Sequence, residues 1–283
     1  MPGPLNRTLA NCGWAIGGLL AAAALTTGGT TVYTWLLAGD ALSFLCAAAL
    51  TARCGEPPSA ARTVATSAGP ATAPRPTSPW RDRTYLAYTA TEAVLFLDDA
   101  VFKVGLPLWI AHATHAPSGL APLLMVLSNV LVIALQVPLA RFGATSRAAR
   151  TLLLPVAACF TIGGIALTVS AATDIAVAVT ALTAAAIAFT LAEILHATAS
   201  WELSLALAPE RSQGAYLGVH GLAQSAQRSA GPLAVTAAIA AGPLGWTVFG
   251  AGIALTCVIQ HRLVRDHLPK PSLSVATATV SDH

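Results

Sequence analysis

Residues 120–140 read LAPLLMVLSNVLVIALQVPLA and contain no charged side chain. A helix needs about 20 mostly apolar residues to cross the roughly 30 Å hydrocarbon core of a bilayer, and this stretch has that length. In water such a helix would expose apolar side chains on every face, whereas lipid accommodates them. The stretch therefore predicts a membrane-spanning helix.

Similar runs occur along the whole chain. Of its 283 residues, 55% are hydrophobic and 10% are charged, whereas soluble domains carry roughly 25% charged residues. About eight runs have the length of a span, and they cover residues 9–26, 31–52, 85–111, 120–140, 152–172, 175–201, 215–240 and 244–261. The sequence therefore predicts an all-α integral membrane protein with about eight transmembrane helices.

The basic residues predict the orientation of these spans. All of the 15 Lys and Arg residues except Lys103 and Arg228 lie in alternate loops or at the two ends. Loops on the cytoplasmic side carry the Lys and Arg excess, so both termini are expected in the cytoplasm of a multi-pass cell-membrane protein. The net charge of +3 is thus explained by topology, and no nucleic acid is expected as a partner.

Composition also divides the chain into segments. Residues 1–54 contain two spans, and residues 84–268 contain six. Between them, residues 55–83 are rich in Pro, Ala, Ser and Thr, which is typical of a flexible cytoplasmic linker. Residues 269–283 are expected to be a disordered cytoplasmic tail.

No motif of a soluble enzyme or of an ATP-driven pump is present. The sequence has no GxSxG, HExxH, P-loop or Rossmann glycine pattern. The 5 cysteines are scattered without the spacing of a zinc site, so we interpret them as packing residues. We therefore expect neither a cofactor nor a metal, and active transport would have to use an ion gradient.

Ionisable side chains inside the third run are the strongest functional signal, because charge at membrane depth needs a partner or water. In a regular helix Glu92, Asp99 and Lys103 fall on one face, whereas Asp98 points away from it. One interpretation is an Asp99–Lys103 ion pair that neutralises itself. The other is a polar stripe along a cavity, where Glu92 or Asp99 exchanges protons or meets a cationic substrate. The two interpretations are compatible.

Other runs contribute further polar candidates. In the seventh run, His220, Gln224 and Gln227 share a face with Arg228 at its edge, and Glu193 and His196 in the sixth run could face them. In the fourth run, Asn129 and Gln136 share a face, where hydrogen bonds between helices are the simpler explanation. An arginine near mid-membrane, such as Arg228, needs a carboxylate or an anionic ligand. The predicted cavity set is Glu92, Asp99, Lys103, Asn129, Gln136, Glu193, His220, Gln224 and Arg228.

Four segments carry a resemblance to a known family. PERSQGAYLGVHGL at 209–222, closed by Gly231-Pro232, resembles the loop and start of span eleven in exporters of the major facilitator superfamily. NRTLANCGWAIGGLL at 6–20 resembles the start of their span five, LAGDALSFL at 37–45 resembles span six, and GLPLWI at 105–110 resembles the outer part of span seven. The similarity extends over nearly the whole chain.

This resemblance implies a partial major facilitator fold. The chain would comprise two helices of the amino-terminal half and a six-helix carboxy-terminal half, with the first four spans missing. It implies a transporter, not an enzyme, that exports small molecules by proton-coupled alternating access between the two halves. The antiporter motif of span five is half present: Gly13 and Gly17 fit it, but Gly18 replaces a proline and Ala21-Ala22 replace glycines.

Three alternatives remain open. A chain without four spans could be a transport-inactive membrane fragment, or a homodimer could supply the missing cavity wall. Asp98-Asp99 also resembles the magnesium motif of membrane prenyltransferases, although no second aspartate cluster follows. On the leading hypothesis, the partners are the lipid bilayer, a small-molecule substrate and protons.

Overall fold

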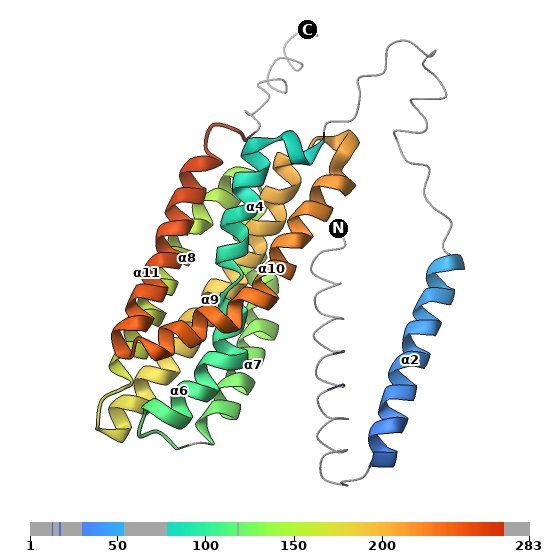
Figure 1. Ribbon diagram of the computed structural model, residues 1–283. Coiled ribbons are helices and arrows are strands. Elements are labelled where there is room, and N and C mark those ends of the chain that lie inside the picture. The colour runs from blue at the N-terminus through green and yellow to red at the C-terminus, as the bar shows by residue number, and fades with distance from the viewer. Residues whose placement is uncertain (1–12, 14–16, 18–29, 54–77, 118, 269–283) are drawn as a thin grey trace, which may run out of the picture. The chain divides into compact units, whose positions relative to one another are not determined.

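The computed structural model describes residues 13, 17, 30–53, 78–117 and 119–268, and in these residues the secondary structure is entirely helical (Figure 1). The chain divides into two compact units, Met1–Arg75 and Pro76–His283. The first predicted span, the linker up to residue 77 and the tail after residue 268 lie almost wholly outside the described residues.

In the first unit the structure describes one long helix, α2 (Thr30–Arg53). It coincides with the predicted run 31–52. Nearly all its described side chains are exposed, including Trp35 at 74% and Phe44 at 69%. An apolar helix with bare Trp and Phe side chains has a surface suited to lipid or to another helix and not to water.

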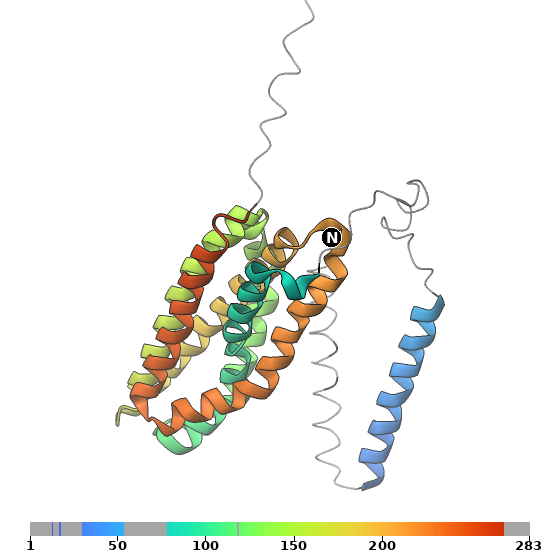
Figure 2. The same ribbon diagram turned by 45° about the horizontal axis from the view of Figure 1, so that its top comes forward.

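The second unit is a helical bundle. Its elements are η1 (Pro79–Arg81), α4 (Arg83–Leu95), α5 (Asp98–Ala100), η2 (Val101–Gly105), α6 (Leu106–Ala113), α7 (Leu120–Ala140), η3 (Arg141–Gly143), α8 (Ser146–Val169), α9 (Ile175–Leu207), η4 (Glu210–Ser212), α10 (Gln213–Ala240) and α11 (Pro243–Leu263). α8 packs along α9 on one side and α11 on the other, while α4 contacts both α10 and α11 (Figures 1 and 2).

Among the described residues, five helices are long and apolar enough to cross a membrane. They contain the segments Thr31–Leu50, Leu120–Gly143, Ser146–Val169, Ile175–Leu207 and Pro243–Leu263. Two further predicted runs are not among these five helices. The run 215–240 does form the long helix α10, but Gln, Ser and Gly lower its hydropathy. The run 85–111 is interrupted between α4 and α6.

That interruption has a definite backbone pattern. After α4, the N–H groups of Leu97, Asp99 and Ala100 donate to carbonyl oxygens three residues back, at 3.1–3.3 Å. The next segment, η2, is a π-helix. A tight turn advances about 120° per residue where an α-helix advances about 100°. Side chains beyond the turn therefore do not keep the register that a regular helix would give them.

Small residues allow α8 and α11 to cross closely. A Cβ added to Gly250 would lie 2.5 Å from the carbonyl oxygen of Phe160 and 3.1 Å from the Cα of Gly164. No side chain fits there, so the glycines set the distance between the two helices. Such small-residue contacts are typical of membrane helices, which gain little from hydrophobic burial against one another.

Gly250→Ala should destabilise the bundle by about 1–3 kcal/mol, because backbone atoms would have to move to admit the methyl group. Gly252→Ala on the same helix is the matched control, since nothing lies within 4 Å of its added Cβ. Thermal unfolding of both purified variants in detergent measures the difference. Equal midpoints would contradict this account of the crossing.

Candidate functional site

The most buried charged side chain in the described bundle is Glu92 of α4, which is 0% exposed. Its Oε2 accepts a hydrogen bond of 2.5 Å from Ser200 Oγ of α9, and its Oε1 accepts one from Gln260 Nε2 of α11. His196 Nε2 of α9 lies 3.3 Å from Oε2 and forms an ion pair with it when the ring is protonated. Glu92 thus joins three helices through both oxygens.

Aromatic and hydroxyl groups enclose this carboxylate. The hydroxyl of Tyr88 donates to the backbone oxygen of Ser200 at 2.8 Å, and its ring stacks on His220 of α10 at 5.9 Å. His220 Nε2 lies 3.3 Å from Ser200 Oγ. The ring of Phe96 contacts the imidazoles of both His196 and His220 edge-on. We call Tyr88, Glu92, His196, Ser200, His220 and Gln260 the glutamate cluster.

The glutamate cluster lies toward one end of the bundle. Glu92 is nine residues from the start of α4 at Arg83, or roughly 14 Å along the helix. The ends of α9 and α11 and the start of α10 lie at this same end (Figure 1). This is also the end that carries the arginines of the predicted cytoplasmic loops, such as Arg147 and Arg211.

A second polar group lies halfway along the helices. Lys103 Nζ forms an ion pair of 2.7 Å with Asp99 Oδ2, and the two side chains are 52% and 42% exposed. Gln227 Nε2 of α10 donates to the same oxygen at 3.2 Å. We call Asp99, Lys103 and Gln227 the open triad. The predicted ion pair is therefore present, but Glu92 is enclosed elsewhere and shares no face with Lys103.

The polar residues that were predicted to share one face of α10 lie on two different faces. His220 and Gln227 are buried, whereas Gln224 and Arg228 are exposed. The rest of the exposed face consists largely of small residues, among them Gly214, Gly218, Ser225, Ala226, Ser229 and Ala230. Exposed positions on α7 and α11 are instead mostly large and apolar: Leu123, Val126, Val130, Ile133, Val137, Leu244, Val248, Leu255 and Ile259.

The remaining predicted residues lie on α7 and α9 and differ in exposure. Asn129 is exposed on α7, while Gln136 on α7 and Glu193 on α9 are half-buried. The hydrogen bond between α7 and α9 is made instead by Ser128 and Thr190, at 3.0 Å. The sequence predicted a polar contact of this kind for α7 but not the residue that makes it.

Asp98, which the sequence predicted to point away from the face of Asp99 and Lys103, is buried in the bundle. It is 3% exposed, and His196 interacts electrostatically with both carboxyls. The tight turn before α5 shifts the register of the helix, and beyond it Asp98 is buried while Asp99 and Lys103 are half-exposed. Asp98 and Asp99 face different surroundings, so they do not form the paired oxygen site that a magnesium motif requires.

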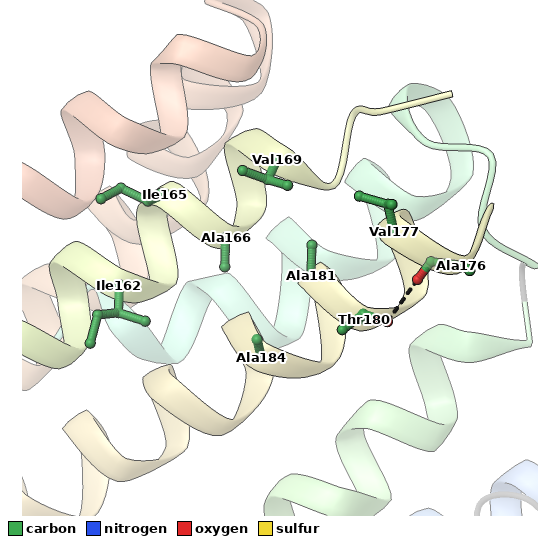
Figure 3. A pocket seen from close by; sticks show the side chains of 9 residues that line it. All are labelled: Ile162, Ile165, Ala166, Val169, Ala176, Val177, Thr180, Ala181 and Ala184. Carbon is green, nitrogen blue, oxygen red and sulfur yellow. Dashed lines mark hydrogen bonds between the residues drawn. The ribbon is translucent and has the colours of Figure 1, made fainter. Parts of the chain in front are cut away.

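An apolar groove lies away from both polar groups. It encloses about 570 Å³ between α8 and α9, and Figure 3 shows the side chains that line it. Its one hydroxyl, on Thr180, donates to the backbone oxygen of Ala176 at 2.7 Å. With no free polar group, the groove suits a hydrocarbon chain better than a polar substrate.

Sequence reasoning missed Tyr88, Ser200 and Gln260, which complete the glutamate cluster. Gln260 adjoins His261 and Arg262 at the end of a run, where a polar residue predicts the membrane boundary and not an interior contact. Ser200 and Tyr88 carry no distinctive spacing. In comparisons with known proteins, no family model matches this chain and no curated protein sequence matches it.

Glu92→Ala should destabilise the bundle strongly, because it leaves the buried donors of Ser200 and Gln260 without an acceptor. An unsatisfied buried donor costs about 1–3 kcal/mol. Glu210→Ala, which removes an exposed carboxylate, is the matched control. Equal losses of unfolding free energy in the two variants would show that Glu92 does not hold the helices together.

Proposed function

We propose that this chain is a secondary transporter of small molecules in the cell membrane, of the major facilitator type, that exports its substrate by proton-coupled alternating access. The observation that carries the proposal is the fully buried Glu92, held by His196, Ser200 and Gln260 from two neighbouring helices. An intramembrane ionisable residue is by default a functional group, because its insertion is expensive.

The two kinds of exposed helix face support a membrane protein with a polar chamber. Large apolar side chains on α7 and α11 suit contact with lipid tails. The face of α10 that bears Gln224 and Arg228 does not, because an exposed arginine in hydrocarbon needs water or a partner. A water-filled substrate path beside α10 would satisfy it. Gln227 is buried on another face of α10, but Asp99, to which it donates, is partly exposed.

The Glu92–His196 pair has the chemistry of a proton carrier. Holding one proton, the pair is neutral, either as carboxylate and imidazolium or as carboxylic acid and imidazole. Losing that proton leaves one negative charge among buried side chains. A conformation that exposes the pair to water therefore favours release, whereas this enclosed arrangement favours retention. This difference can couple proton movement to a change of access.

The proposed orientation predicts which loops can be reached from outside the cell. Single cysteines replace the exposed His115 and Glu210 in a chain whose 5 native cysteines are alanine. A membrane-impermeant maleimide added to intact cells should label His115→Cys and not Glu210→Cys. The reverse pattern would invert the topology. Labelling of both cysteines, or of neither although both react in permeabilised cells, would contradict the proposed orientation.

The transport proposal predicts loss of uphill efflux in Glu92→Gln and Asp99→Asn. Fluorescent organic cations and anions, loaded into cells that express the wild-type chain, first identify a transported probe. Each variant should then lose efflux against a gradient, because the carboxylate that exchanges protons is gone. Glu210→Gln, an exposed loop substitution, should transport at the wild-type rate. Unchanged efflux in both test variants, or no exported probe for the wild type, would overturn the proposal.

A further inference from the structure

The carboxyl of Asp98 is a buried acidic group that the proposed function does not use. It is 3% exposed. Its Oδ1 accepts the backbone N–H of Asp99 at 2.8 Å, but its Oδ2 has no hydrogen-bond partner in the structure. A buried carboxylate oxygen without a donor is costly, and a proton on that oxygen removes the charge.

The groups around Asp98 come from every helix packed on this segment. On α9, His196 and the half-buried Glu193 act on it electrostatically, and Asp99 does so from its own segment. On α11 the nearby titratable group is the buried thiol of Cys257. From α10 come Gly231, whose added Cβ would lie 2.8 Å from Ala100, and the neutral Gln227, bonded to Asp99. Neither neutral residue supplies a countercharge.

We propose that Asp98 is a second proton-binding site, whose charge state is coupled to that of His196 in the glutamate cluster. His196 acts electrostatically on both Asp98 and Glu92, and Asp99, the next residue, belongs to the open triad. When a proton binds, an O–H bond forms on the unpartnered Oδ2 and the carboxyl loses its charge.

The role of this site in coupling rests on the proposed function, whereas the existence of the site does not. Infrared difference spectra of the purified protein, recorded from about pH 5 to about pH 8, report protonated carboxyls through their carbonyl stretch. We expect a titrating band that disappears in Asp98→Asn. It should persist in Glu210→Gln, the control, which removes an exposed loop carboxylate outside both polar groups.

Two further variants test the connection and guard against misfolding. His196→Gln should move the midpoint of the Asp98 band by about one pH unit or more, since a charged neighbour is lost. Asp98→Glu should restore a titrating band. A band unaffected by Asp98→Asn, or a midpoint unmoved by His196→Gln, overturns the inference even if the chain transports. If the band behaves as expected but the chain exports no probe, the proton-binding site is supported and only the transport proposal fails.

Discussion

The enclosed carboxylate of Glu92 is the constraint around which one end of the bundle is arranged. A charge with no exposed surface can persist only if its oxygens are bonded, and here the donors come from α9 and α11 while α10 adds His220. The helices therefore cannot slide or rotate independently at this end. Any protonation that weakens these bonds would loosen contacts among four helices at once, which is how a local charge change becomes a larger movement.

The break between α4 and α6 separates the open triad from the glutamate cluster. A continuous helix would have held Glu92, Asp99 and Lys103 in one row. The tight turn and the π-helical segment instead direct Asp98 into the bundle and leave Asp99 and Lys103 half-exposed. Interrupted helices commonly mark functional sites in membrane proteins, because the irregular backbone is tolerated only where protein or water surrounds it.

The arrangement of surfaces is consistent with this division of roles. The apolar faces of α7 and α11 and the groove between α8 and α9 offer contacts for hydrocarbon. The exposed positions of α10 are mostly glycine, alanine and serine, with Gln224 and Arg228 and two leucines, Leu222 and Leu233. Small side chains allow a helix, a substrate or water to approach closely, and they provide no anchor for lipid. The two surfaces differ because large apolar side chains make favourable contacts with lipid tails, whereas a polar path needs space and hydrogen-bonding groups.

Composition and run length alone determined that the chain is helical and that several helices could span a membrane, because every backbone group in lipid must be bonded within its own segment. Spacing alone also predicted the pair of Asp99 and Lys103, whose contact is local. The partners of Glu92 could not be predicted this way, since Ser200 and Gln260 are 108 and 168 residues distant. Nor could the burial of Asp98, because a turn of a few residues changes the rotation of a helix, and only packing against α9 and α10 decides where such a turn is made.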